Sequence, residues 1–443
     1  MYIPNDVDMI ITELNNHGYE AYAVGGCVRD SLLKRTPKDW DITTSAKPEE
    51  VKQVFKRTID TGIQHGTVTV MIGKEGYEVT TYRVDGEYAD HRHPDTVTFT
   101  VNLEEDLKRR DFTINAMAWH PRSGIVDLFD GQKDLAEGRI RCVGCPDERF
   151  DEDALRMMRA VRFSAQLGFN IEEETSEAIR RHATDLKNVS AERVREELVK
   201  LLTSAHPEKI HDAWALGITA VVLPEYDRIV GVPVNNPNHI YDIETHTIKT
   251  LCEVPASQAL RLTMLFHDFG KVEVRRAEGD HDVFPEHAAA SERLAAKIMK
   301  RLKFDNDNLN RVRLLVKYHS MKYAAEESSV RRCMNIIGRD YFEDFMCVQR
   351  ADLMGKHPDL LEKGLIELGQ KEAICHEILR RDDCFEVKKL AVTGRDLIMA
   401  GIPQGPKLGL VLAGLLDQVI DDQSLNQKEK LLELAKDIFK QMD

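Results

Sequence analysis

The sequence predicts an α+β protein whose strands are confined to its N-terminal third. Residues 1 to about 142 mix short strand patterns with helices, whereas from about 148 onward apolar residues recur almost wholly at helical spacing. At 443 residues the chain exceeds what one hydrophobic core normally supports, so two to four domains are expected. We place the divisions at residues 1–142, 143–225, 226–355 and 356–443.

The N-terminal third begins with a helix that Asn5 or Asp6 can cap and that ends near Gly18, and Pro48 can open another helix. Strands are predicted at residues 19–24, 39–44, 67–72 and 77–82. The last two strands alternate apolar and polar residues and are joined by Gly73–Gly76, which predicts a hairpin.

The rest of the chain shows long apolar periodicities that predict helices. They lie at residues 153–167, 190–203, 256–268, 286–302 and 309–319. Prolines and asparagines break the chain near 231–239, which indicates a junction, and glycines and prolines punctuate residues 384–406.

The composition limits the class of protein. With 42% hydrophobic and 31% charged residues, no apolar run of about 20 residues and no signal-like start, we expect a globular cytoplasmic protein with no membrane segment. The eight scattered cysteines suit reduced thiols, and Cys142 with Cys145 forms half of a zinc pattern, which is more typical of structural cysteines. A formal net charge of −14 argues against unspecific nucleic-acid coating, so an RNA partner would need local basic patches.

The strongest chemical signal is a pair of carboxylates, Asp39 and Asp41. Side chains two residues apart on a strand point to the same face, where two carboxylates can hold a divalent metal or a close pair of metals. A lone pair of this kind is usually a polar strand end. Here, however, it follows Gly25-Gly26, which lets backbone approach a triphosphate at a helix start, with Arg29 as a counter-charge.

Further candidates lie in the two segments that follow. Glu78, on the predicted hairpin, can supply a third carboxylate that positions an attacking hydroxyl and its metal; otherwise it is an exposed strand residue. Residues 84–102 look like a mobile loop, in which His91 and His93 are more typical of solvated side chains than of metal ligands.

Residues 109–116 (Arg-Arg-Asp-Phe-Thr-Ile-Asn-Ala) pack two cations, a carboxylate and small polar groups before an apolar stretch. Such a cluster can hold ribose hydroxyls and phosphates, with arginine supplying the fork and Asp or Asn the acceptor. A capped helix with a solvated basic start is the alternative. It explains the aspartate and threonine but not the adjacent arginines.

Asp153, Arg156, Arg159 and Arg162 recur every three residues, so neighbours in this series lie along one gradually turning helix face. An ordinary salt bridge explains Asp153 with Arg156 but not two further arginines. Cytosine and adenine both present an amino donor beside an unprotonated ring nitrogen. An aspartate that accepts from the amino group and an arginine that donates to the ring nitrogen would therefore take C and A and reject U and G.

In order and spacing, these motifs closely resemble the bacterial class II tRNA nucleotidyltransferases, the CCA-adding enzymes. The matching segments are Gly25–Asp30, Asp39–Asp41, Arg109–Thr113, Val126–Leu135, Glu152–Arg156 and Val189–Arg193. The resemblance is dense over residues 19–203 and looser over 394–409. It implies a polymerase-β-like catalytic head at 1–142, a helical neck with a nucleotide-selecting helix, an HD-type body and a tRNA-binding tail.

The resemblance also implies roles for individual residues. Asp39 and Asp41 would bind Mg²⁺, and Gly26 and Arg29 would contact the phosphates. Arg110 and Asp111 would hold the nucleotide and its ribose. Asp153 and Arg156 would read the base, with Arg159 and Arg162 near the triphosphate. Residues 127–134 would form a hinge, although Gln132 replaces a glycine often found there.

A second metal site is predicted in residues 226–355. His246, His267, Asp268 and Asp352 follow the H…HD…D order of the HD phosphohydrolase superfamily, and the mixed N and O ligands suit a transition metal. His287 and His319 can complete a second metal position, or one of them can help to bind a phosphate. Some CCA-adding enzymes carry an HD domain that acts on phosphorylated RNA ends.

The resulting hypothesis is template-independent addition of C, C and A to the tRNA 3′ end from CTP and ATP, with pyrophosphate released. The intact loop at 84–102 favours full C-C-A addition, because enzymes that add only the two cytidines tend to lack part of it. The alternatives are a poly(A) polymerase or an A-adding enzyme of the same family, and a protein whose principal activity is the HD phosphohydrolase. The oligomeric state is not predicted.

Overall fold

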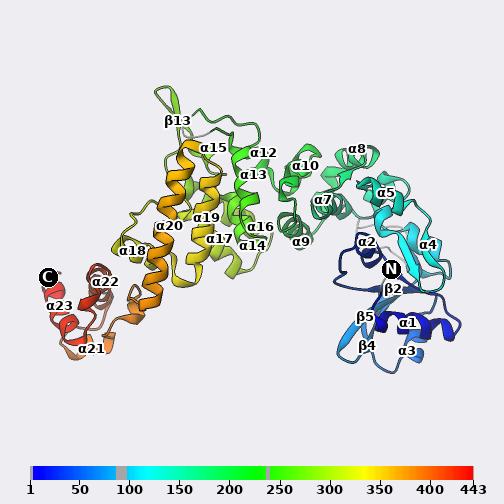
Figure 1. Cartoon of the computed structure of the whole chain (residues 1–443), viewed down its shortest axis with the longest axis horizontal. Coiled ribbons are helices and arrows are strands. Elements are labelled where there is room, and N and C mark those ends of the chain that lie inside the picture. The colour runs from blue at the N-terminus through cyan, green and yellow to red at the C-terminus, as the bar shows by residue number, and fades with distance from the viewer. Residues whose placement is uncertain (1–2, 86–96, 236–239, 443) are drawn as a thin grey trace. The chain divides into compact units, whose positions relative to one another are not determined.

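The structure of the chain, a computed structural model, describes residues 3–85, 97–235 and 240–442 (Figure 1). Its contacts divide the chain into two compact units. The first comprises Met1–Asp227 with Arg301–Lys303, and the second comprises Arg228–Lys300 with Phe304–Asp443. The contacts divide the chain between Asp227 and Arg228, whereas the junction was expected near 231–239 and the division at 225/226. The finer divisions at 142/143 and 355/356 stay predictions.

A mixed sheet of seven strands, in the order β3-β4-β5-β2-β1-β8-β9, forms the framework of the first unit. Its strands are β1 (Ala21–Val24), β2 (Asp41–Thr44), β3 (Thr58–Gly62), β4 (Thr67–Ile72), β5 (Glu75–Thr81), β8 (Met117–His120) and β9 (Gly124–Asp127). Within this sheet only β2 and β5 run parallel, and their register sets Asp41 beside Glu78. The antiparallel pairing of β1 with β2 sets Asp41 beside Val24, directly before Gly25.

Short helices precede, connect and follow these strands. They are α1 (Asn5–Asn16), α2 (Gly26–Leu32), α3 (Pro48–Val54), α4 (Leu103–Lys108) and α5 (Gly131–Glu137). The predicted hairpin is confirmed as β4 and β5, and α3 begins at Pro48 as expected. Two expectations are corrected. Pro4, not Asn5 or Asp6, precedes the first helix, and the strand expected from residue 39 begins at Asp41, where pairing with β1 begins.

The remainder of the first unit is helical, with two small strand pairs beside it. The helices are α6 (Pro146–Glu152), α7 (Leu155–Leu167), α8 (Glu173–His182), α9 (Ala191–Leu202), α10 (Ile210–Ala215), α11 (Thr219–Val222) and α12 (Pro224–Asp227). The strand pairs are β6 (Arg83–Asp85) with β7 (Val97–Phe99), and β10 (Arg139–Ile140) with β11 (Asn170–Ile171). Helix α7 packs against α9, and this contact builds one wall of the site described below.

The second unit is built almost entirely from helices. They are α13 (Ile243–Glu253), α14 (Gln258–Phe266), α15 (Lys271–Val274), α16 (His287–Arg301), α17 (Asn306–Tyr318), α18 (Glu327–Ile337), α19 (Phe342–Met354), α20 (Pro358–Arg381), α21 (Gly394–Met399), α22 (Pro406–Asp421) and α23 (Lys428–Lys440). One hairpin, β12 (Arg276–Glu278) with β13 (His281–Val283), interrupts them.

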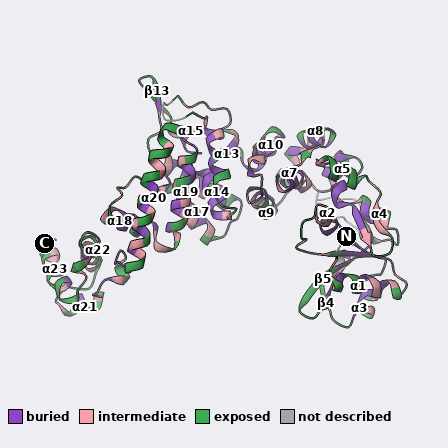
Figure 2. Ribbon diagram, viewed as in Figure 1, coloured by how far each residue is buried: buried purple, intermediate pink, exposed green. Residues whose placement is uncertain are grey.

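Helix α14 is the central helix of this unit. It packs against α13, α17 and α19, and every residue from Ala259 to Phe266 is buried (Figure 2). Polar groups at the end of α14 are therefore removed from water and need protein or ligand partners. A second hydrophobic cluster includes Phe345, Leu368 and Leu415, so its packing continues across residue 355.

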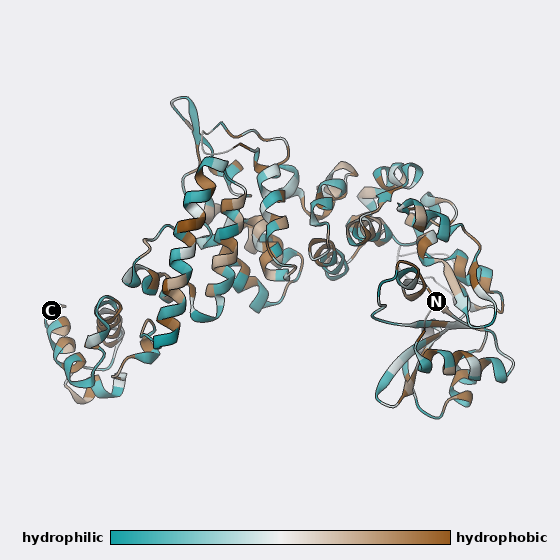
Figure 3. Cartoon of the chain, in the orientation of Figure 1, coloured by the Kyte–Doolittle hydropathy of each residue, from teal (hydrophilic) through white to brown (hydrophobic). Residues whose placement is uncertain are grey.

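Polar and apolar residues alternate along the helices (Figure 3). Across the part of the chain that the structure describes, none of the helices combines the length and the apolar character that crossing a membrane requires.

Candidate functional site

The first candidate site is a cavity of about 590 Å³ in the first unit. Its lining includes every proposed catalytic or nucleotide-binding residue except Glu78: Gly26, Arg29, Asp39, Asp41, Arg110, Asp111, Asp153, Arg156, Arg159 and Arg162. Glu78 lines an adjacent cavity of about 240 Å³, to which Asp41, Arg109 and Arg110 also contribute. The residues that the sequence singled out over more than 130 positions thus converge on one region.

The turn between β1 and α2 brings backbone to the edge of the cavity. Gly25 has φ +81, a conformation that favours glycine, and its N–H donates to the carbonyl of Met117 at 3.1 Å. A Cβ at Gly25 would lie 3.1 Å from the Nη1 atom of Arg110. The glycine therefore allows both the sharp turn and the close approach of a guanidinium.

Asp41 lies among an arginine and two other carboxylates. Burial raises the pKa of the Asp41 carboxyl, and the neighbouring Glu78 and Asp39 raise it further, while Arg110 acts in the opposite direction. Carboxylates that repel one another in this way are stabilised by a divalent cation. Asp39 lies just before β2 rather than in it, but both aspartates line the cavity.

Asp106, which sequence reasoning missed, holds the adjacent arginines in place. Its fully buried carboxylate accepts hydrogen bonds from Arg109 at 2.7 and 3.0 Å, from Arg110 at 3.3 Å and from Thr43 at 3.1 Å. Burial alone would raise the pKa of Asp106, but Arg110 and Arg109 hold it below its ordinary value. The spacing of three and four residues from Arg109 and Arg110 is the signal that could have identified it.

Asp111 is buried and already has protein partners. Arg159 donates to its Oδ2 atom at 2.5 and 2.8 Å, and Asn115 donates to its Oδ1 atom at 3.0 Å. Burial opposes ionisation, but these contacts keep the pKa of Asp111 below its ordinary value. In this structure Asp111 therefore positions Arg159, and a contact with ribose stays a prediction.

The stretch from Glu152 to Arg162 is not one continuous helix, contrary to expectation. Helix α6 ends at Glu152, and Asp153 has an extended backbone with φ −146 and ψ 101 before α7 begins at Leu155. Its Oδ1 atom accepts from the N–H of Leu155 at 3.1 Å, which satisfies an N-terminal donor of α7. The series with three-residue spacing therefore begins in a junction between helices.

The side chains of Asp153 and Arg156 have separate partners, although the N–H of Arg156 donates to the backbone carbonyl of Asp153 at 2.9 Å. Arg193 of α9 donates to both carboxylate oxygens of Asp153, at 2.7 and 3.2 Å. Arg156 pairs with Glu152 and donates to the backbone carbonyls of Arg149 and Arg109, at 3.1 and 3.0 Å. The simple Asp153–Arg156 salt bridge is thus absent, and both side chains line the cavity.

Phe163, which the sequence did not indicate as a site residue, lies among three arginines. The guanidinium carbons of Arg162, Arg29 and Arg159 lie 3.9, 5.0 and 5.4 Å from the centre of its ring. A ring face attracts cations, so Phe163 lowers the cost of gathering like charges. Arg162 is also paired with Glu197 of α9 at 2.5 Å, and its burial lowers its pKa to about 10.

We expect the substitution Phe163→Leu to raise the KM of a triphosphate substrate by about fivefold, because each cation–π contact contributes only about 0.5–1 kcal/mol. Phe163→Tyr keeps the ring and should behave like the natural chain. Steady-state kinetics of nucleotide incorporation measure both variants. Equal behaviour of the Leu and Tyr variants would show that the ring does not position the arginines.

The charge of the cavity suits a polyanion. Seven arginines and four aspartates line it: Arg29, Arg109, Arg110, Arg156, Arg159, Arg162 and Arg193, with Asp39, Asp41, Asp111 and Asp153. Arginine forks bind phosphate oxygens in a bidentate manner, so the cavity can hold a triphosphate despite the net charge of −14 over the whole chain. The local basic patch required for an RNA or nucleotide partner is present.

The second candidate site contains four histidines of the second unit with one shared arrangement. Each Nδ1 lies at hydrogen-bond distance from a backbone carbonyl: His246 from Gly355 at 3.0 Å, His267 from Met264 at 2.7 Å, His287 from Phe284 at 3.0 Å, and His319 from Val316 at 2.7 Å. A carbonyl only accepts, so each Nδ1 carries the proton, and each neutral ring keeps its lone pair on Nε2.

The Nε2 atoms face one another in pairs. They are 3.2 Å apart in His246 and His267 and 3.3 Å apart in His287 and His319. Burial lowers the pKa of His319 to about 3 and also lowers that of His287. The gap between the two Nε2 atoms of the second pair is therefore not bridged by an added proton. The first pair differs, because Asp268 keeps the pKa of His267 above its ordinary value despite burial.

Asp268 lies between the two pairs. Its Oδ2 atom is 3.5 and 3.3 Å from the Nε2 atoms of His246 and His267, and its Oδ1 atom is 3.7 and 3.8 Å from those of His287 and His319. Neither oxygen accepts a hydrogen bond of good geometry, although the ammonium of Lys271 lies 2.6 Å from Oδ2. Unpaired lone pairs around a buried carboxylate fit divalent cations.

All six residues that the sequence proposed for this site are therefore brought together. They form two groups that can each hold an ion, His246 with His267 and Asp352, and Asp268 with His287 and His319. Asp352 completes the first group, with its Oδ1 atom 3.2 Å from the Nε2 atom of His246. Their role as metal ligands stays a prediction.

Three other expectations meet different outcomes. Most of the loop at 84–102, including His91 and His93, lies outside the described residues.

Among the described residues, none of the possible metal-binding groups contains a cysteine, so Cys142 and Cys145 have no ligand partners for a zinc site. In the segment predicted as a hinge, Asp127 accepts from the N–H groups of Gly131 and Gln132, both at 2.8 Å.

Comparisons with known proteins point in one direction. Three family models match: the poly A polymerase head domain at residues 21–141, the probable RNA- and SrmB-binding site of polymerase A at 168–230, and tRNA nucleotidyltransferase domain 2 at 286–435. The CCA-adding enzyme of Levilactobacillus brevis is 36% identical over 442 residues, which cover 98% of this chain and 99% of that protein. The CCA-adding enzyme of Lactobacillus helveticus is 58% identical over 197 residues, 44% of this chain and 49% of that one.

Solved structures agree with these relatives. The Bacillus stearothermophilus CCA-adding enzyme in complex with CTP is similar over 100% of this chain and 99% of its own, with a TM-score of 0.78 and 29% identity. The Thermotoga maritima CCA-adding enzyme complexed with tRNA is similar over 98% of this chain and 95% of its own, with a TM-score of 0.58. At 21% identity the second comparison shows the fold alone.

Proposed function

The chain belongs to the CCA-adding enzymes, and on this premise we propose that it adds C, C and A to the 3′ end of tRNA from CTP and ATP, releasing pyrophosphate. The single observation that carries the proposal is the cavity that gathers Asp39 and Asp41 with seven arginines and Asp153. Two relatives that cover 98% and 96% of the chain are CCA-adding enzymes, which favours this activity over a poly(A) polymerase. A cytoplasmic location stays a prediction.

Asp39 and Asp41 are the groups that would hold the divalent metal on which this family depends, and we propose Mg²⁺. When bound there, Mg²⁺ would lower the pKa of the terminal tRNA hydroxyl and neutralise part of the triphosphate charge. The arginines then hold the triphosphate in line with the hydroxyl, and Asp106 and Asp111 fix the directions of Arg110 and Arg159. Glu78, beside Asp41, can position the attacking hydroxyl.

Nucleotide choice would depend on Asp153 and Arg156. Asp153 accepts from the amino group of cytosine or adenine, and Arg156 donates to the ring nitrogen. Arg193 holds Asp153 through two hydrogen bonds, so the carboxylate is oriented before the base arrives. Uracil and guanine would leave buried polar groups unpaired, which makes their rejection strong.

Sequencing the products from three tRNA substrates, ending at the discriminator base, at C and at C-C, tests this proposal. The purified chain, with Mg²⁺, CTP and ATP, should complete each end to C-C-A and stop. Products that end at C-C or extend as poly(A) would contradict full C-C-A addition, and no incorporation at all would refute the nucleotidyltransferase proposal.

The histidine and aspartate cluster supports a second candidate function. We propose that the six residues would hold two transition-metal ions, and that the site so loaded would hydrolyse a phosphate ester such as an RNA 3′ phosphate end. Hydrolysis would transfer the phosphoryl group to water and release the alcohol oxygen with a proton. None of the relatives named above carries a hydrolase name, so this function depends on the cluster alone.

The purified chain carrying Asp39→Asn and Asp41→Asn, which removes the metal ligands proposed for the first cavity, is loaded with nickel, manganese or cobalt and dialysed. It is expected to retain about two ions, as in other two-metal carboxylate–histidine sites. His267→Ala should lose metal, whereas His281→Ala, an exposed histidine of the same unit, should not. Elemental analysis gives the ion count. Equal numbers of bound ions in the two variants, or hydrolysis that survives His267→Ala, would show that the cluster does not carry out the hydrolysis. Asp39→Ala, which changes only the first cavity, should still hydrolyse the ester.

A further inference from the structure

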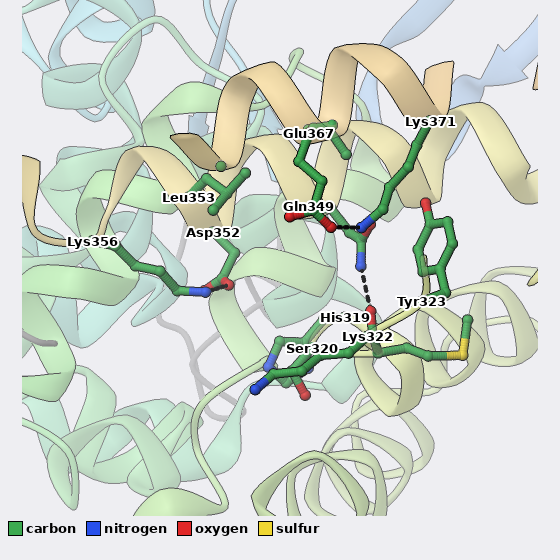
Figure 4. Close-up of a pocket in the computed structure, with 13 residues that line it drawn as sticks. His319, Ser320, Lys322, Tyr323, Gln349, Asp352, Leu353, Lys356, Glu367 and Lys371 are labelled. Atoms are coloured by element: carbon green, nitrogen blue, oxygen red, sulfur yellow. Dashed lines mark hydrogen bonds and ion pairs between the residues drawn. The ribbon is translucent and has the colours of Figure 1, made fainter. Parts of the chain in front are cut away.

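Cavities adjoin both candidate sites. One of about 360 Å³ lies beside the histidine and aspartate cluster, and His319 and Asp352 line it (Figure 4). Because both residues are proposed metal ligands, that cavity belongs to the second candidate site. The cavity of about 240 Å³ that contains Glu78 adjoins the first candidate site. Thr67 and Thr80 line it but do not line the cavity with the seven arginines, so it can hold a ligand other than the triphosphate.

The larger and the smaller cavity of the first site share part of their walls. Asp41, Arg109 and Arg110 line both of them. Nucleotide addition brings two substrates to one catalytic cation, because the hydroxyl of one attacks the phosphate of the other. With the triphosphate among the seven arginines, the second substrate must also reach Asp41. The smaller cavity is the place for the sugar that carries the attacking hydroxyl.

One face of the sheet forms part of the wall of the smaller cavity. The register of β4 with β5 sets Thr67 beside Thr80, and Glu78 lies two residues before Thr80, on the same face. The intervening Val68 and Val79 are fully buried on the opposite face. The two threonine side chains are therefore directed away from the core, toward the cavity that they line.

The hydroxyls of Thr67 and Thr80 form a pair that can bind a third hydroxyl. Their Oγ1 atoms are 3.0 Å apart, so one of them donates to the other. A hydroxyl has one proton and two lone pairs, so the pair keeps one proton to donate and three lone pairs to accept with. Among the residues that the structure describes, neither Oγ1 atom has another hydrogen-bond partner.

The size and charge of the cavity indicate which part of an RNA end it takes. Its volume of about 240 Å³ lies below the range for small-molecule sites, about 300–1,000 Å³, and suits a sugar with its phosphate rather than a whole nucleotide. Arg83 and Arg109 supply cations for the phosphate, and Glu78 supplies an acceptor for a hydroxyl. The 2′-hydroxyl, which both donates and accepts, is what distinguishes RNA from DNA at such a site.

We propose that this cavity binds the ribose at the 3′ end of the tRNA, with Thr67 and Thr80 in contact with its 2′-hydroxyl. The inference rests on the proposed nucleotide addition and adds a specificity to it. It concerns the strand that is extended, not the sugar of the incoming triphosphate. Because the 2′- and 3′-hydroxyls lie on adjacent carbons of one ring, holding the first also directs the second toward Glu78 and Asp41.

The test compares two acceptors, tRNA that ends at its first C with either a ribose or a 2′-deoxyribose in that last nucleotide. Incorporation of labelled CTP by the full chain gives kcat/KM for each end. The parent chain should use the ribose end about tenfold better or more, because the deoxyribose end leaves the threonine pair without its partner. Thr67→Val and Thr80→Val keep the side-chain shape and suit a strand. Each should lower this ratio, and the double variant should bring it close to one.

Thr69→Val is the matched control, because Thr69 lies on the same strand and face, and its hydroxyl pairs with that of Thr61 at 2.8 Å, outside the cavity. It should keep the ratio of the parent chain. Each ratio is taken within one variant, so a general loss of activity does not change it.

Three results would overturn the ribose subsite and leave nucleotide addition standing. They are equal use of the two ends by the parent chain, an unchanged ratio in the double valine variant, and an equal fall of the ratio in Thr69→Val. No incorporation on the ribose end would instead overturn nucleotide addition, and this inference with it.

Discussion

Asp41→Asn is expected to abolish nucleotide addition, with a loss of at least about 100-fold in kcat, because an amide of the same size cannot supply the negative charge that holds a catalytic cation. The local environment sharpens this expectation. Asp41 lies beside Glu78 across the parallel strands and shares the cavity with Asp39, so burial and like charge already raise its pKa. The cation that relieves this repulsion is lost with the charge.

The measurement is incorporation of labelled CTP into tRNA that lacks its terminal C-C-A, at saturating substrate and with Mg²⁺ varied. Asp60→Asn is the matched control, because Asp60 is an exposed aspartate of β3 in the same sheet. It should retain full activity. Activity of the Asp41 variant within a few-fold of the control, without a higher requirement for Mg²⁺, would exclude Asp41 as a metal ligand.

The two candidate sites differ in how much of each the sequence alone predicted. Asp39, Asp41 and Gly25 lie in a short strand-turn-helix segment, where spacing along the chain nearly fixes spacing in space. The residues that orient the neighbouring arginines and Asp153 were not predicted in that role. Asp106 and Phe163 were missed, and Arg193 stood only within the Val189–Arg193 motif without a role, because their partners are chosen by tertiary packing, and a buried aspartate or phenylalanine is otherwise an unremarkable core residue.

The break at Asp153 shows a different limit of sequence reasoning. A spacing of three residues predicted one helix, but the side chain of Asp153 satisfies a backbone donor at the start of α7, and Arg193 holds it there. Local hydrogen bonding by aspartate competes with helix formation, and periodicity does not report that competition. For the second site, the order of histidines and aspartates indicated the candidate metal ligands. The contacts that each histidine Nδ1 makes with a backbone carbonyl could be seen only in the structure.

Asp153→Ala is expected to relax base selection, so that the ratio of kcat/KM for CTP over UTP falls on the order of 100-fold, the effect of losing one paired polar contact with a base. The structure adds a second variant. Arg193→Gln leaves Asp153 in place but removes its two hydrogen bonds, so the same ratio should fall by a smaller factor. The first variant removes the carboxylate, whereas the second changes only how the carboxylate is held.

Arg195→Gln provides the control, because Arg195 is two residues along the same helix and donates to the backbone carbonyl of Lys303 instead. Competition between labelled CTP and UTP on one tRNA substrate gives the ratio directly. A ratio unchanged in Asp153→Ala would refute its role in base reading. A lower ratio in Asp153→Ala with no change in Arg193→Gln would mean that α7 alone orients the carboxylate, since Leu155 already donates to Oδ1 from the first residue of that helix.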